Sequence, residues 1–318
     1  MRHRIMAAAM TAGLQICVTA GGLAQGPTTG IASVGTDMDR TLTEELTRVE
    51  QSFWTATRDS DARALERLVA PEFTLRSAAM RDRSLPRQIW MGNTISGLKD
   101  ARFQLLYVAA RKLTDDLAVA SQQNESGGVI NGRDASCICY GVDFWKKRQG
   151  AWQIVGRYAV GARAPAADRG RPDGPPGVSE QLTTADVDPQ LTDTLRELEQ
   201  QLASAALRRF SDSTIVDRLV DSEFTLRTSA APERSVSRAS WIEIARMQNI
   251  VSIEEHYHAA RRLAEDVGVV SLMLTLKAAD DHPESGGRFF VVDVWKNQKS
   301  NWRLIARYSG EMLEIRPR

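Results

Sequence analysis

The chain carries one sequence pattern twice, with the two occurrences about 150 residues apart. The segment Arg67–Arg76 reads RLVAPEFTLR and returns as RLVDSEFTLR at Arg218–Arg227. Near the end of each occurrence, Trp152–Tyr158 returns as Trp302–Tyr308. This period is far longer than that of a solenoid repeat and has the size of a whole domain. The sequence therefore predicts two copies of one fold, in which each residue can be compared with its counterpart.

The overall composition narrows the classes of partner. The 318 residues are 42% hydrophobic and 25% charged, which is ordinary for a soluble globular protein. Their formal net charge is only +1, so no strong field attracts nucleic acid or an anionic membrane surface. We therefore expect no nucleic-acid partner.

The first 24 residues have the composition of a signal peptide. Arg2 and Arg4 precede an apolar stretch, Ile5–Ala20, and Gly22–Ala24 then offers small residues for cleavage. A buried helix or a membrane anchor is the alternative, but the stretch is short for a span, which needs about 20 apolar residues. We expect cleavage near Ala24, a periplasmic or secreted protein, and no membrane anchor afterwards.

Beyond Cys17, which falls in this leader, the chain has two cysteines, Cys137 and Cys139. Residues two apart on a strand share a face, but their geometry rarely suits a mutual disulfide. Two sulfurs without a nearby histidine also make a poor metal site. Because the second copy has Gly287 and Phe289 at these positions, we expect buried thiols here.

Composition divides the rest of the chain into a flexible lead-in (25–40), copy one (41–163), a Pro/Gly linker (164–188) and copy two (189–318). Each copy shows apolar periodicity for helix, helix, strand and helix, followed by a meander of four or more strands. This order predicts an α+β fold, with about three N-terminal helices packed on one face of a curved antiparallel sheet.

Local signals place several boundaries. Thr41–Glu44 fits a helix-capping box in copy one, and Asp188 followed by Pro189 fits a helix start in copy two. In the last hairpin of copy one, Lys147–Gly150 is expected to form a four-residue loop.

The order of elements, the Leu68–Phe73 segment and the closing segments Asp143–Lys146 and Trp152–Tyr158 resemble the nuclear transport factor 2-like superfamily. The nearest branch is the SnoaL-like and ketosteroid isomerase-like set. This resemblance implies two tandem cone-shaped barrels, each open at one end and able to hold a small apolar ligand. Because the same fold serves isomerases, dehydratases, polyketide cyclases, non-catalytic binders and oligomerisation modules, it does not give the function.

Catalytic members of this family usually place a carboxylate or histidine inside the cone, which makes Asp143 and Asp293 the first candidates. An apolar pocket raises the pKa of a carboxylate and suits it to general-base catalysis. Strand alternation from the expected loop places Asp143 and Tyr158 on one face and Arg157 on the other, so Asp143 is not expected to pair directly with Arg157 unless a β-bulge intervenes. The alternative is a rim aspartate bonded to backbone.

Copy two alone contains a histidine pair, His256 and His258, where copy one has Leu106 and Val108. Alternation on a strand would point both side chains to one face, as a proton relay or two metal ligands require. Zinc would need a third ligand, for which Asp293 or His282 could be considered, but no spacing in the sequence points to either, so we expect no metal and no cofactor. The alternative is a pair of surface or partly buried histidines.

In this family the third helix borders the cone mouth, so Trp90 and Trp241 are candidates for stacking on a ligand; core packing is the alternative. The candidate catalytic residues are Asp293, His256, His258 and Tyr308. The candidate ligand-binding residues are Trp90, Asp143, Tyr158, Trp241 and Tyr257.

Three functions remain open at this point. The first is an exported protein that binds a small apolar or aromatic ligand in a cone-shaped pocket. The second is a lyase or isomerase active in copy two. The third is an interaction scaffold in which the two copies form an internal pseudo-dimer, with a homodimer as a further possibility.

Overall fold

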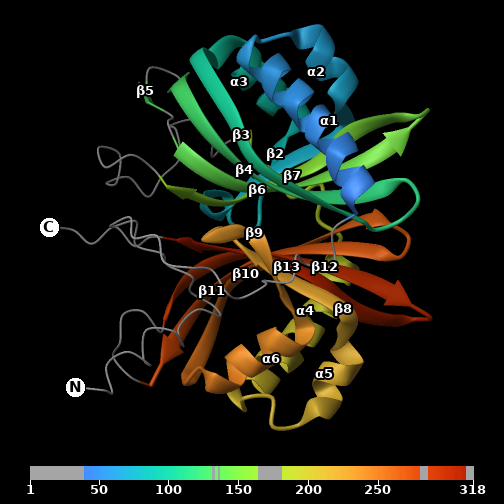
Figure 1. Ribbon diagram of the computed structural model, residues 1–318, viewed down its shortest axis with the longest axis vertical. Helices are drawn as coiled ribbons and strands as arrows, with labels where there is room; N and C mark the ends of the chain where they lie inside the picture. The colour runs from blue at the N-terminus through green and yellow to red at the C-terminus, as the bar shows by residue number, and fades with distance from the viewer. Residues whose placement is uncertain (1–38, 131–132, 135–136, 164–180, 280–285, 313–318) are drawn as a thin grey trace, which may run out of the picture.

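A computed structural model describes residues 39–130, 133–134, 137–163, 181–279 and 286–312 (Figure 1). It contains two α+β units, as expected from the duplication. The two sheets lie next to each other in the middle of the molecule, and the helices of each unit cover the outer side of its own sheet (Figure 1). The predicted signal peptide (1–24), almost all of the lead-in and most of the linker lie outside the described residues.

Copy one forms three helices, a short 3-10 turn and seven strands. They are α1 (Arg40–Arg58), α2 (Ala62–Leu68), β1 (Val69–Ser77), the 3-10 turn η2 (Ala78–Met80), β2 (Leu85–Pro86), α3 (Arg87–Gly97), β3 (Leu98–Lys112), β4 (Leu117–Ile130), β5 (Arg133–Asp134), β6 (Cys137–Arg148) and β7 (Ala151–Arg163).

Copy two repeats this order without an equivalent of β5 among its described residues. Its elements are α4 (Pro189–Leu207), α5 (Ser213–Leu219), β8 (Val220–Thr228), β9 (Ala231–Ser237), α6 (Arg238–Met247), β10 (Ile250–Ala264), β11 (Val267–Ala278), β12 (Gly287–Gln298) and β13 (Asn301–Met312).

Both first helices begin at an aspartate. The Asp188 carboxylate accepts a hydrogen bond from the Leu191 amide at 2.9 Å, and Pro189 is the first helical residue, as predicted. In copy one the corresponding cap is Asp39, which accepts from the Leu42 amide, so the predicted capping box at Thr41–Glu44 is wrong. The helix begins two residues earlier because aspartate is the stronger cap.

The sheets are mixed, whereas purely antiparallel sheets were expected. Their strand orders are β2-β1-β7-β6-β4-β3 and β10-β11-β12-β13-β8-β9. The pairs β1/β7 and β8/β13 are parallel. Between the paired strands the chain runs through β2, α3 and β3–β6 in copy one, and through β9, α6 and β10–β12 in copy two. All other pairs are antiparallel.

The last hairpin of copy one turns more tightly than predicted. Its loop has two residues, Gln149 and Gly150, with φ of 50° and 82°, and not the four residues Lys147–Gly150. The register also shifts between Phe144 and Trp145, where a β-bulge inserts one residue. Asp143 therefore lies directly opposite Arg157, which corrects the expectation that these two residues would not pair.

The hairpin of copy two has the same features. Lys299 and Ser300 both have positive φ, a bulge lies between Val294 and Trp295, and Asp293 lies opposite Arg307. The two copies therefore share an irregularity in the same strand at the same place.

The sheet faces that look away from the helices pack against each other. One apolar cluster combines side chains of both copies, among them Tyr140, Phe144 and Tyr158 of copy one with Phe290 and Tyr308 of copy two. Separate clusters lie between the helices and the sheet within each copy.

Two arginines cross between the sheets in opposite directions. Arg111 of copy one donates a hydrogen bond to the Ile305 carbonyl at 2.7 Å. Arg261 of copy two donates to the Val155 carbonyl at the same distance. Val155 and Ile305 are counterparts in the two copies, so these contacts are related by an approximate twofold symmetry.

Candidate functional site

Each copy buries a cluster of two carboxylates, one guanidinium and one indole between its first helix and its sheet. In copy two, Arg307 donates two hydrogen bonds to the Asp293 carboxylate, at 2.7 and 2.5 Å, and a third to Glu199 at 2.9 Å. The indole N–H of Trp295 donates to the other oxygen of Glu199 at 3.0 Å. The cluster is therefore closed by its own hydrogen bonds.

Copy one contains the same cluster. Arg157 binds Asp143 at 2.7 and 2.5 Å and Glu50 at 3.3 Å, and the Trp145 indole donates to Glu50 at 2.9 Å. The Arg157 guanidinium also lies over two aromatic rings of α1, 4.4 Å from the centre of Phe53 and 4.3 Å from that of Trp54.

These clusters change the ionisation of their members. Burial, followed by repulsion from the neighbouring aspartate, raises the pKa of Glu50 and of Glu199 well above the usual range. Burial lowers the pKa of Arg307, but Asp293 and Glu199 outweigh this effect and raise it overall. The arrangement therefore favours the neutral form of each glutamic acid.

A cavity of about 480 Å³ opens in copy two between its helices and the concave face of its sheet. Most of its wall is apolar, from α4, α6, β11 and β12: Leu202, Ala203, Ala206, Leu207, Trp241, Ala245, Leu272, Leu274, Leu276, Phe289 and Val291. Glu199 and Arg307 also line it, so the buried cluster forms part of its wall.

Copy one has aromatic side chains at two positions where copy two has smaller side chains that leave room for the cavity. Trp54 and Phe103 occupy the positions of Ala203 and Ile253, and their ring centres lie 4.6 Å apart. Both Ala203 and Ile253 line the cavity of copy two. The stacked rings of copy one therefore take up space that is open in copy two.

Further polar side chains line the cavity of copy two, among them Glu255 and Gln248. Glu255 lies 3.6 Å from Arg196, and burial raises the pKa of its carboxyl although Arg196 partly opposes the shift. The amide oxygen of Gln248 is buried and has no hydrogen-bond partner among the described residues. Apart from the closed cluster, Glu255 is the titratable side chain of the cavity wall, and Gln248 contributes a buried acceptor without a partner among the described residues.

The structure separates the two candidate histidines, which corrects the expectation that both face one side. A bulge between Glu255 and Tyr257 reverses the alternation of β10 at His256. His256 is exposed and contacts the Thr275 hydroxyl at 2.7 Å. His258 is buried opposite Leu272 on the helix-facing side, and neither ring nitrogen has a hydrogen-bond partner among the described residues.

Burial, together with the positive charge of Arg196, lowers the pKa of His258 to about 4. The residue is therefore a neutral imidazole at physiological pH. His258 is absent from the cavity wall, and so is Asp293, which stays behind Arg307.

The candidate tyrosines lie on the opposite face of the sheets from the aspartates. Tyr158 and Tyr308 belong to the apolar cluster between the copies, and Tyr257 packs against it. The bulge at Trp145 exchanges the predicted faces of Tyr158 and Arg157. The structure thus brings Asp293 together with Arg307 and Glu199, and not with Tyr308 or His256.

The two helix tryptophans are both buried but differ in surroundings. Trp241 packs between Phe210 and Phe224 and also lines the cavity of copy two. Trp90 stacks on Phe53 with ring centres 5.5 Å apart, within the apolar core of copy one.

Sequence reasoning did not identify the glutamates of the buried clusters. Glu50 lies between Leu46 and Phe53 on the apolar side of α1, and Glu199 lies between Leu195 and Leu202 on that of α4. A carboxylate at the same place in the apolar stripe of both first helices was the signal that could have found them.

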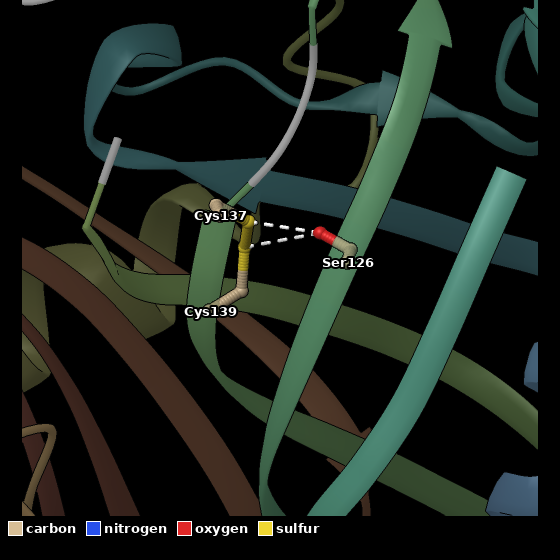
Figure 2. Close-up of a disulfide and its surroundings, with 3 residues drawn as sticks. All are labelled: Ser126, Cys137 and Cys139. Atoms are coloured by element: carbon tan, nitrogen blue, oxygen red, sulfur yellow. Dashed lines mark hydrogen bonds between the residues drawn. A yellow bond between two sulfur atoms is a disulfide. The ribbon is translucent and has the colours of Figure 1, made fainter. Parts of the chain in front are cut away.

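The two cysteines are neither thiols nor fully buried, which corrects the prediction. Cys137 and Cys139 form a disulfide within β6, next to Ser126 of β4, and both residues are half-buried (Figure 2). The ranges that the structure describes contain no group of three or more histidine, cysteine or acidic side chains placed to hold a metal ion. They also contain no helix with the length and apolar character of a transmembrane span.

No family model and no curated protein matches the chain. The solved structures to which it is similar include an NTF2-like protein from Cytophaga hutchinsonii, with 15% identity and a TM-score of 0.35 over 40% of this chain and 100% of that one. A second is an NTF2-like protein of unknown function in nutrient uptake from Rhodospirillum rubrum, with 20% identity and a TM-score of 0.33 over 36% and 94%.

A third is a putative dehydratase from the NTF2-like family of Streptomyces avermitilis, with 13% identity and a TM-score of 0.32 over 37% and 94%. Each of these proteins matches a stretch the length of one unit. These three solved structures are NTF2-like proteins, and at this identity the likeness concerns the fold alone.

Proposed function

We propose that copy two binds one small, mostly apolar molecule in the cavity between its helices and its sheet. The observation that carries this proposal is the cavity itself, whose volume of about 480 Å³ falls within the usual range for small-molecule sites. Leucine, phenylalanine, valine and tryptophan side chains supply the contact surface, and their burial by a ligand would provide the free energy of binding.

The polar groups of the wall indicate where a ligand would be fixed. Arg307 and Glu199 already satisfy each other within the closed cluster. The buried amide oxygen of Gln248 has no partner among the described residues, and a ligand N–H or O–H would relieve the cost of leaving it unpaired. The structure therefore favours an apolar molecule with one hydrogen-bond donor.

Binding is better supported than catalysis by the predicted lyase or isomerase residues. Both oxygens of Asp293 accept hydrogen bonds from Arg307, and Asp293 does not line the cavity, so its carboxylate would not contact a bound ligand as a general base must. His256 is exposed and contacts Thr275, and Tyr308 lies between the copies, so neither can assist Asp293.

A scaffold role is a second candidate, and the contact between the two sheets favours it. The shared apolar cluster and the reciprocal contacts of Arg111 and Arg261 support an internal pseudo-dimer that is covalently joined in one chain. This role is compatible with ligand binding because the cavity lies on the helix side of the sheet. The composition of residues 1–24 supports export of the protein.

A fluorescent probe with the proposed chemistry tests the binding site. N-phenyl-1-naphthylamine is aromatic and has a single N–H donor, so we expect saturable fluorescence enhancement with one probe per chain. The substitution Ala203→Trp places an indole in the cavity and should weaken probe binding about a hundredfold or more. Glu197→Trp, on the exposed side of the same helix, is the matched control and should leave binding unchanged.

Circular dichroism and thermal denaturation would establish that both variants are folded. Unchanged affinity in a folded Ala203→Trp variant would contradict the proposal, as would several equivalent probes bound to each chain.

A further inference from the structure

The disulfide between Cys137 and Cys139 joins two residues of one strand that are separated by a single residue (Figure 2). Strand β6 is already held by hydrogen bonds to β4 and β7 on its two sides. A disulfide stabilises a fold mainly by restricting the unfolded chain, and this effect is smallest when the closed loop is short. This disulfide is therefore expected to add little to the stability of the fold, so a chemical role for it has to be considered.

Polar side chains of the neighbouring strand surround the two sulfurs. In the register of β4 and β6, Ser126 lies opposite Cys137 and Asn124 lies opposite Cys139. The Ser126 hydroxyl oxygen is 3.0 Å from the sulfur of Cys137 and 3.9 Å from that of Cys139. A hydroxyl at this distance can donate a hydrogen bond to a thiolate and so stabilise it.

Asn124 supplies a second, independent observation. Its side chain is only 1% exposed, and neither its amide oxygen nor its amide nitrogen has a hydrogen-bond partner among the described residues. Leaving such a group unpaired costs free energy, so it points to a partner that forms at another stage. A thiolate at Cys139 would accept from the amide nitrogen.

This arrangement is particular to copy one. The counterparts of Cys137 and Cys139 are Gly287 and Phe289, and those of Asn124 and Ser126 are Leu274 and Leu276. The cysteines and their polar neighbours therefore stand where copy two builds the apolar wall of its cavity.

We propose that Cys137 and Cys139 form a thiol–disulfide exchange site whose substrate is a thiol. A substrate thiolate attacks the sulfur of Cys139, the bond between the two cysteines breaks, and Cys137 leaves as a thiolate that accepts a hydrogen bond from Ser126. A second substrate thiolate then attacks the mixed disulfide and releases the substrate disulfide, and the Cys139 thiolate is left.

In the balanced reaction, the protein disulfide and two thiols give a protein dithiol and one substrate disulfide. Two electrons pass from the substrate to copy one, and the two protons of the substrate thiols end on the cysteines. The half-buried position of both cysteines gives an attacking thiolate access from solvent.

The exchange can be followed in the full chain with Cys17→Ser, which leaves only these two of the three cysteines. The oxidised protein is incubated with glutathione at neutral pH, and free thiols are alkylated and counted by mass spectrometry. We expect two new thiols and one glutathione disulfide per chain. With Cys137 also replaced by serine, the Cys139 thiol is incubated instead with glutathione disulfide, which it should attack to retain one glutathione as a mixed disulfide and release the other as a thiol.

A second arm replaces glutathione by a reduced, unfolded polypeptide with two cysteines. Faster exchange in this arm would identify protein thiols as the substrate, and faster exchange with glutathione would identify small thiols. Either result supports the exchange site.

The role of Asn124 can be tested by replacing it with leucine, which is the residue at the corresponding position of copy two. Asn124→Leu removes the amide beside Cys139 and should slow exchange about tenfold, because a hydrogen bond to the developing thiolate is lost. Gln122→Leu, which removes another buried amide of β4 that lies opposite Gly141 and not opposite a cysteine, is the matched control and should not change the rate.

A structural brace would behave differently. Reduction should leave the urea midpoint of the chain almost unchanged if the disulfide is an exchange site. A disulfide that resists both thiol substrates until the chain unfolds, or a midpoint that falls strongly on reduction, would overturn the proposal.

Discussion

The two copies keep the same buried charged cluster but differ in the wall above it. In each copy an arginine holds an aspartate in a bidentate pair and reaches a glutamate of the first helix. On β4 and β6 of copy one the side chains that face the helices beyond the cluster are Gln122, Asn124, Ser126 and Cys139, and on β11 and β12 of copy two they are Leu272, Leu274, Leu276 and Phe289.

This difference shows which part of the fold is open to change. The cluster ties the first helix to the last hairpin, so altering one member leaves buried charge without a partner. The helix-facing side chains beyond the cluster can either fill the space between helices and sheet or enclose a cavity there, and they can be polar or apolar. Function is therefore expected to differ between the copies at the wall, while their stability depends on the cluster.

The largest effect is expected from removing the guanidinium. Arg157→Leu and Arg307→Leu each leave a buried aspartate and glutamate unpaired, which should lower the free energy of unfolding by about 3–5 kcal/mol. Arg157→Leu should cost about 1 kcal/mol more, because Arg157 also lies over Phe53 and Trp54. Urea denaturation of the full chain measures both values, and equal losses would remove this distinction between the copies.

The next largest effect concerns His258, whose counterpart is Val108. Its folded pKa of about 4 lies below the unfolded value of about 6.5, so the folded chain favours the neutral ring. This contribution to stability is complete above pH 6.5 and is lost as the pH falls toward 4, by roughly 3 kcal/mol.

Replacing this residue by that of copy one, His258→Val, should therefore reduce the loss of stability in acid. His256→Leu, at the exposed histidine on the opposite face, should keep the wild-type loss. Thermal denaturation across this pH range makes the comparison, and identical acid profiles for His258→Val and wild type would contradict the assignment.

The smallest effect should be the same in both copies. Because the folded pKa of Glu50 and of Glu199 is raised, the stability that each protonated carboxyl contributes is complete below its unfolded pKa and is lost as pH rises through the folded pKa. Glutamine keeps an acceptor for the tryptophan N–H but does not ionise. Glu50→Gln and Glu199→Gln should each reduce the alkaline loss of stability, by about 1 kcal/mol.

Melting temperatures from mildly acid to mildly alkaline pH would show this effect as a shallower slope. A steeper slope in either variant would mean that the glutamate is ionised in the folded protein.

Much of the fold followed from the sequence because its signals are local or repeated. The apolar stripes of α1 and α4, the cap at Asp188 and the repeated closing strands were sufficient for the order of elements. The parallel pairing of the first and last strands was missed, since nothing in a strand's own residues states which neighbour it meets.

The candidate site depended on irregularities that the pattern does not reveal. Phe144 and Trp145 are both apolar and both fully buried, so alternation gives no sign of the bulge that turns Arg157 toward Asp143. The bulge at His256 has the same consequence for the histidine pair. The cavity arises from Ala203 and Ile253 together, which are distant in sequence and meet only in the folded chain.

The contact between the sheets also determines how many units of each kind one molecule contains. In a symmetric homodimer both subunits have the same sequence, so both cavities are open or both are filled by side chains. Here the reciprocal contacts of Arg111 and Arg261 join two halves that belong to one polypeptide and differ in sequence. Dilution cannot separate these halves or exchange them between molecules, so every molecule carries one half of each kind at any concentration.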